Sequence, residues 1–146
     1  VLARMTKTIM AIVFTYGSLM CDDIMAAVTG QALASESASL NDFARYAVRN
    51  EAYPAIVPEA SAKVQGRVYY DVNELVLARL DLFEGDWYSR VALEVEVQGT
   101  LVEAQTYVFR DECRQQLADW LWDFEFFLQH GKHIFTAEYL GYQRLG

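Results

Sequence analysis

The chain has 146 residues, of which 53% are hydrophobic and 14% aromatic, and its formal net charge is −8. This length suits one domain that buries roughly two-thirds of its unfolded surface, and the composition excludes an intrinsically disordered protein. The negative charge argues against a nucleic-acid or membrane partner, because both bind basic patches. We therefore expect a single domain over residues 1–146, with residues 1–8 as a loose N-terminal extension.

Two cysteines, Cys21 and Cys113, are too few for a disulfide framework and lack the spacing of metal ligands. Arg4, Lys7 and the apolar residues 9–14 resemble the start of a signal peptide, but two aspartates soon interrupt that segment. No uncharged stretch approaches the ~18 residues of a membrane-spanning helix. These features predict a cytoplasmic protein without a membrane partner.

The N-terminal part of the chain predicts a strand followed by a short helix. Ile9–Tyr16 is an apolar, β-branched run that ends at a Gly-Ser pair, which is typical of a buried strand. Cys21–Thr29 has helical character, with two aspartates suited to its first turn. Gly30 is then the expected end of this helix.

Two further strands are expected before residue 71. Ala38–Val48 alternates apolar and polar residues, and Lys63–Tyr70 is strand-like with Gly66 as a candidate bulge. The two prolines of residues 53–58 lack ladder donors, so this stretch is not expected to form a central strand.

A helix and a hairpin follow in the sequence. Asn73 suits the N-cap of a helix that runs to about Glu84 and ends at Gly85. Tyr88–Val97 and Leu101–Phe109 are strand-like and are joined by a glycine turn, so they predict a hairpin. Two acidic residues on the first of these strands most simply face solvent.

The last part of the chain is expected to be helical. Apolar residues at i, i+3 and i+4 predict a helix from Asp111 to about Gln129, and Ile134–Tyr142 predicts another. Aromatic residues cover both sides of the longer helix, which is either deeply buried or covers a pocket or a second subunit of a homodimer: Trp120, Trp122, Phe124, Phe126 and Phe127. The element order predicts an α+β domain on an antiparallel or mixed sheet, curled into a barrel.

The loop Thr15–Met20 is the first candidate site. A strand runs there into a turn at Gly17 and Ser18 and then into a helix start, which aims backbone N–H groups at one point and binds carboxylate or phosphate. The same pattern also fits a plain turn after a strand. Ser18 is disfavoured as a hydrolase nucleophile, because the Gly-x-Ser-x-Gly elbow is absent.

Glu84 is the second candidate. On a helical wheel it falls between Leu77 and Leu80, so its carboxylate points along the apolar face if the helix extends that far. Burial and the negative end of the helix dipole would both raise its pKa, which suits a general base near neutral pH. The alternatives are a frayed last turn with Glu84 in water, and Asp81 as the functional acid.

Four segments carry a family resemblance: VFTYGSLM from Val13, YPAI from Tyr53, VQGRVY from Val64 and LDLFEGDWYSR from Leu80. Their order and spacing, over roughly residues 9–110, resemble the γ-glutamylcyclotransferase superfamily, within it the γ-glutamylamine cyclotransferase and plant avirulence-induced branch. The resemblance implies a small, mainly antiparallel mixed β-barrel flanked by a few helices. It also implies a cavity beside the Tyr-Gly-Ser-Leu loop and no metal or cofactor.

The resemblance implies that Glu84 is the catalytic base, because it is the glutamate of a Glu-Gly-x-x-Tyr-x-Arg stretch. The substrate-binding residues are then those of the loop and the two that complete this stretch: Tyr16, Gly17, Ser18, Leu19, Met20, Tyr88 and Arg90. The substrate is a γ-glutamyl amine or peptide, whose own α-amine attacks its γ-carbonyl to give 5-oxoproline and a released amine. The alternatives are a non-catalytic small-molecule binder with a stress or defence role, and hydrolysis or acyl transfer in the same pocket.

The remaining reactive residues favour structural roles. His130 and His133 lack an evident third ligand, so we expect an ordinary helix end and no metal site. Cys21 lies near a helix start, but the neighbouring aspartates oppose a lowered thiol pKa.

Overall fold

Five strands form a closed ring of pairings in the computed structural model, which describes residues 10–146. The strands are β1 (Ala11–Thr15), β2 (Ser35–Val48), β3 (Pro54–Val72), β4 (Tyr88–Val97) and β5 (Thr100–Phe109). Their order is β3-β1-β5-β4-β2, and β2 pairs with β3 to close the ring. Only the β1–β5 pair is parallel. The expected mixed α+β fold is confirmed, whereas residues 1–8 and the charged start of the signal-like segment lie outside the described residues.

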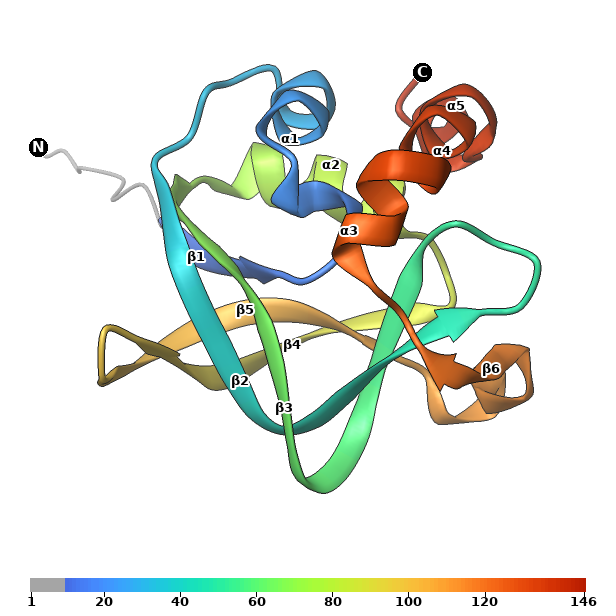
Figure 1. Cartoon of the computed structure of the whole chain (residues 1–146). Coiled ribbons are helices and arrows are strands. Elements are labelled where there is room, and N and C mark those ends of the chain that lie inside the picture. Colours follow the sequence, from blue (N-terminus) through green and yellow to red (C-terminus); the bar gives the residue numbers. More distant parts are fainter. Residues whose placement is uncertain (1–9) are drawn as a thin grey trace, which may run out of the picture.

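The helices gather over one end of the ring (Figure 1). They are α1 (Asp22–Thr29), α2 (Glu74–Glu84), α3 (Phe124–Phe126), α4 (Lys132–Glu138) and α5 (Gly141–Arg144). One apolar cluster fills the ring and a second lies under the helices. Successive strand residues serve the two clusters in turn: Val13 packs under the helices and Phe14 packs inside the ring. No helix in residues 10–146 is long and apolar enough to span a membrane.

The two prolines lie inside β3, which begins well before the strand expected over Lys63–Tyr70. Pro54 pairs with Ala47 and Pro58 with Phe43, both on β2. On the other side of β3, the pairing with β1 begins only at Arg67. The proline-bearing half therefore pairs on one side alone, where a missing N–H is tolerated as it is on an edge strand.

Gly66 is not the site of a bulge. The β2–β3 register runs without a shift through Gly66, and the irregularity lies between Asn41 and Phe43 instead. A Cβ on Gly66 would lie 2.1 Å from the carbonyl oxygen of Thr15. The glycine is therefore needed because β1 passes so close to β3 at this point.

The long helix expected over residues 111–129 is wrong. This segment is divided into a 3₁₀ helix (Asp111–Gln116), the strand β6 (Leu117–Leu121), α3 and one π-helical turn (Phe127–Gly131). β6 pairs with β2, and the indole N–H of Trp122 donates to the carbonyl of Ala52 at 2.8 Å. Strand pairing and burial of the indole thus override the helical spacing. The second expected helix is present as α4 and α5, which are separate.

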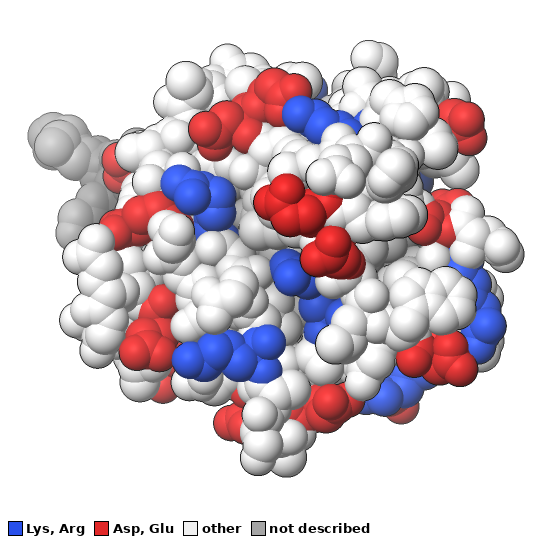
Figure 2. Space-filling model, viewed as in Figure 1, with Lys and Arg blue, Asp and Glu red and all other residues white. Residues whose placement is uncertain are grey.

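The aromatic cluster of this segment is divided between core and surface. Trp122 and Phe127 are buried, whereas Trp120 and Phe126 are 59% and 63% exposed. The homodimer expected through these residues stays a prediction. Figure 2 shows acidic and basic side chains interspersed on one face of the molecule.

Candidate active site

The helix α2 places Glu84 and follows the sequence closely. The Asn73 side chain accepts a hydrogen bond from the N–H of Val76 at 2.9 Å, which caps the helix start. The helix ends at Gly85, whose positive φ of 85° is a backbone conformation that glycine adopts easily. Glu84 is therefore the last helical residue, and the last turn is not frayed.

A narrow inner pocket joins Glu84 to the Tyr-Gly-Ser-Leu loop. Its volume is about 30 Å³, which suffices for roughly two water molecules. Its walls come from β1 and the following loop, the start of β3, α2, the β4–β5 hairpin and the end of α4: Phe14, Thr15, Tyr16, Gly17, Ser18, Leu19, Tyr53, Pro54, Glu84, Tyr88, Tyr107, Phe135 and Tyr139. The structure thus brings together the two sites that the sequence indicated separately.

A larger outer chamber of about 490 Å³ adjoins the inner pocket. Both cavities are lined by the same five residues: Tyr53, Glu84, Tyr88, Phe135 and Tyr139. The outer chamber also has charged residues of both signs, namely Arg49, Glu51, Asp86, Glu138 and Arg144. Glu84 therefore lies at the boundary between a small pocket and a roomy chamber.

The carboxyl group of Glu84 accepts no hydrogen bond from any residue between 10 and 146. Burial raises its pKa from 4.5 to about 8, Asp81 raises it further, and Arg144 opposes the rise. A carboxyl that is largely removed from bulk water usually has donors that hold it in the charged form, whereas Glu84 is half-buried and faces the cavity without one. This carboxyl is instead unpartnered, protonated at neutral pH and in contact with a cavity.

Five tyrosines line the inner pocket around this carboxyl, and the hydroxyls of four of them donate to other groups. Tyr16 donates to the carbonyl of Tyr107 at 2.6 Å, and Tyr88 donates to that of Pro54 at 2.8 Å. Tyr107 itself donates to Asp81 at 2.7 Å. Burial raises the pKa of each of these tyrosines, so they stay neutral. They form a wall of fixed polar and aromatic groups that leaves Glu84 as the one titrating group of the inner pocket in the described residues.

The loop presents unused backbone donors to the inner pocket. The N–H groups of Gly17, Ser18 and Leu19 have no acceptor within residues 10–146. Gly17 is the N-cap of the 3₁₀ helix η1 (Ser18–Met20), and Ser18 and Leu19 are its first two residues. Their N–H groups are therefore the unpaired donors of a helical start. Gly17 packs against the Pro54 ring, where a Cβ would lie only 2.9 Å away.

Arg45 orients this loop and was missed by the sequence reasoning. Its Nη1 donates to the carbonyl oxygens of Tyr16 at 2.7 Å and Gln65 at 2.9 Å. The Tyr16–Gly17 peptide is trans, so holding its carbonyl on Arg45 points the N–H of Gly17 in the opposite direction. The guanidinium also lies 5.1 Å from the centroid of the Trp122 ring.

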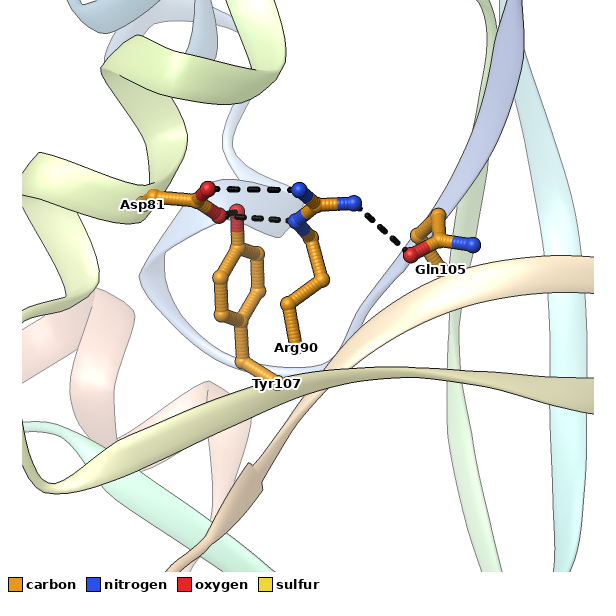
Figure 3. A network of polar contacts seen from close by, with 4 residues as sticks. All are labelled: Asp81, Arg90, Gln105 and Tyr107. Carbon is orange, nitrogen blue, oxygen red and sulfur yellow. Dashed lines mark hydrogen bonds and ion pairs between the residues drawn. The ribbon is translucent and has the colours of Figure 1, made fainter.

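Two of the expected site residues line neither cavity. Met20 packs against the core under the helices. Arg90 forms an ion pair with Asp81, at 2.8 Å from Nε, and donates to the Gln105 side chain at 2.8 Å (Figure 3). This network, which also includes Tyr107, ties α2 to the β4–β5 hairpin one turn before Glu84. Asp81, the rival acid, is therefore engaged in an ion pair.

The other reactive residues have no place in the site. Cys21 is buried and unpaired, and burial raises the pKa of its thiol. His130 and His133 are exposed on the C-terminal segment. No group of three metal-ligating side chains occurs in the part of the chain that the structure describes.

Sequence comparisons place the chain among known proteins. The family model "Gamma-glutamyl cyclotransferase, AIG2-like" matches residues 13–124. AIG2-like protein D of Arabidopsis thaliana is 35% identical over 116 residues, which cover 77% of this chain and 76% of that protein.

Solved structures agree with this assignment. A solution structure from Arabidopsis thaliana is 29% identical and superposes with a TM-score of 0.70, covering 92% of this chain and 82% of the other. A structure named γ-glutamyl cyclotransferase is 21% identical, with a TM-score of 0.61 and coverage of 69% and 67%, and therefore shows the shared fold alone. The chain belongs to the AIG2-like γ-glutamyl cyclotransferase family.

Proposed function

We propose that this protein cyclises the γ-glutamyl group of a γ-glutamyl amine or peptide to 5-oxoproline, with Glu84 as the general base and acid. The α-amine nitrogen of the substrate bonds to the γ-carbonyl carbon, and the amide bond to the leaving nitrogen then breaks. Glu84 accepts a proton from the α-ammonium group before the attack, and the attacking nitrogen loses a second proton once its new bond has formed. Both protons are passed to the departing nitrogen, which leaves as an ammonium ion. The attack is intramolecular, so the protein supplies orientation and proton transfer and needs no nucleophile of its own.

The observation that carries this proposal is the unpartnered carboxyl of Glu84 with its pKa of about 8. A peptide α-amino group has a pKa of roughly 8 in water, and the free α-carboxylate of a γ-glutamyl compound raises the pKa of its α-amine somewhat above this value. The raised pKa of Glu84 therefore brings the carboxyl close to the substrate amine in proton affinity, which favours an acid–base catalyst. An ordinary glutamate, with a pKa near 4.5, would take the proton about a thousandfold less readily.

The loop supplies the complementary binding site. We assign the substrate α-carboxylate to the inner pocket, where it would displace water and accept hydrogen bonds from Gly17, Ser18 and Leu19. A carboxylate is about as large as the two waters that this pocket holds. The leaving amine would then lie in the outer chamber, with Glu84 between the two parts of the substrate.

The proposal is tested by measuring 5-oxoproline release from a panel of γ-glutamyl amines and γ-glutamyl dipeptides. We expect at least one substrate to turn over and Glu84→Gln to lose at least a hundredfold in kcat, as is usual when a general base is removed. Glu94→Gln, the same change on the exposed face of β4, is the matched control and should keep full activity.

Two outcomes would contradict the proposal: no turnover with any substrate of the panel, or full activity in Glu84→Gln. Thermal stabilisation by a γ-glutamyl compound without any turnover would instead favour a binding protein that uses the same pocket.

A further inference from the structure

The C-terminal segment 132–146 lies beyond the residues that match the family model and packs against the end of α2. An α-helix leaves its last four carbonyl groups without helical partners. In α2 these belong to Asp81, Leu82, Phe83 and Glu84. The N–H of Gly85 donates to the first of them at 3.1 Å, and the other three point toward the C-terminal segment.

Two side chains of this segment complete the helix end. Arg144 donates to the carbonyl of Leu82 at 2.6 Å from Nε and to that of Phe83 at 2.9 Å from Nη2. The Tyr139 hydroxyl lies 2.6 Å from the Phe83 carbonyl oxygen and 3.1 Å from that of Glu84, and its proton is shared between them. Arg144 in turn donates to the Tyr139 hydroxyl at 3.3 Å. Every carbonyl of the last turn thus has a donor.

Close packing holds the segment in this position. A Cβ on Gly141 would lie 2.4 Å from the Phe83 carbonyl oxygen, and one on Gly85 would lie 2.6 Å from Arg144. The two glycines therefore allow the C-terminal segment to lie close against the end of α2. The Phe83 ring also packs edge-on, at centroid distances of 5.0 to 6.0 Å, against three rings of the segment: Phe135, Tyr139 and Tyr142.

The same residues form part of the site. Tyr139 lines both cavities, and Arg144 lines the outer chamber. Arg144 is also the charged group that opposes the raised pKa of Glu84. Any movement of these two side chains would change both the last turn of α2 and the electrostatic surroundings of its final residue.

We propose that residues 132–146 are a clamp that fixes the last turn of α2 and thereby the Glu84 carboxyl, with Tyr139 and Arg144 as its positioning residues. The clamp's effect on turnover rests on the proposed function. Its effect on Glu84 itself does not, so the two can be tested separately.

The first test removes one hydroxyl and keeps the packing. Tyr139→Phe should speed amide hydrogen exchange at residues 82–85 by about fivefold, because a buried hydrogen bond contributes on the order of 1 kcal/mol. Tyr142→Phe is the matched control, since this ring packs on Phe83 as well but its hydroxyl bonds to no carbonyl of α2. Exchange at residues 82–85 should be unchanged in the control.

The second test removes the charge. The ¹³C chemical shift of the Glu84 carboxyl, followed against pH, should give a midpoint near 8 in the natural protein and a midpoint higher by roughly half a unit or more in Arg144→Gln. Arg144→Lys keeps the charge but cannot bridge two carbonyls. The Glu84 midpoint should therefore stay near its natural value in this variant, whereas amide exchange at residues 82–85 should be faster than in the natural protein. The surface change Arg114→Gln should alter neither quantity.

If Tyr139→Phe and Arg144→Gln both leave the exchange rates and the midpoint at their natural values, the clamp is refuted, whatever the protein's activity. If both quantities change while no γ-glutamyl substrate turns over, the clamp stands and the proposed reaction falls.

Discussion

Replacing Glu84 by Gln should make the protein more stable, and increasingly so as the pH rises from 5 to 8. In the unfolded chain this carboxyl ionises near pH 4.5, whereas in the folded protein it stays protonated to about pH 8. Between these values the folded state binds more protons than the unfolded state, so the stability of the natural protein falls as the pH rises. The glutamine variant has no such group and loses none of this stability.

The size of the effect follows from the pKa shift. Each unit is worth about 1.4 kcal/mol, so the variant should gain about 3 kcal/mol relative to the natural protein between pH 5 and pH 8. For a domain of this size the difference corresponds to roughly 6–12 °C in Tm. Urea denaturation of both proteins across this pH range measures it, and the difference between them removes the contribution of the other titrating groups.

The matched control is Glu138→Gln, which makes the same change at the last residue of α4, where the side chain is exposed. Its stability difference from the natural protein should stay constant over the same pH range. Parallel curves for Glu84→Gln and the natural protein would show that Glu84 titrates like an ordinary carboxyl, and the argument for its role would then fail.

Three further predictions concern the reaction, the loop and the barrel. The proposed reaction needs Glu84 ionised and the substrate amine protonated in the free reactants. The value of kcat/KM should therefore rise about tenfold per pH unit below pH 8. A profile that levels off by about pH 6 would contradict this reaction. Arg45→Met should lower kcat/KM about tenfold, because it releases the Tyr16 carbonyl, and it should change Tm little. An unchanged kcat/KM would count against the role of Arg45. Gly66→Ala should lower the free energy of unfolding by about 3 kcal/mol, because the new methyl group would collide with the Thr15 carbonyl. Urea denaturation measures this loss, and a value below about 1 kcal/mol would show that β1 shifts easily.

The sequence was most informative where the physics is local. The helix of Glu84 has its N-cap at Asn73 and its glycine stop at Gly85, and both are visible within one turn of the residues they affect. The raised pKa of Glu84 also followed from its wheel position, because an apolar face predicts burial. The β4–β5 hairpin was recognisable for the same reason, since alternation and a glycine turn are contiguous in the chain.

Long-range contacts were not predictable in this way. Segment 117–121 has apolar residues that suit a helix, and only its pairing with β2, about 70 residues earlier, makes it a strand. Arg45 reaches Tyr16 across 29 residues, and Arg144 reaches Phe83 across 61. A single charged residue in an alternating strand or near a chain end gives no local sign of such a partner.

The surroundings of Glu84 argue that its carboxyl is kept for chemistry. The inner pocket contains the side chains of five tyrosines, and a hydroxyl that donated to Glu84 would supply the partner that a structural carboxyl normally has. Instead the hydroxyls of Tyr16, Tyr88 and Tyr139 are held by backbone carbonyls, and that of Tyr107 is held by Asp81. A glutamine at this position would fill the same space without the loss of stability at neutral pH. An acid that destabilises the fold, and to which no neighbouring tyrosine donates, fits the proposed reaction, in which the ammonium group of the γ-glutamyl substrate would bring the missing partner.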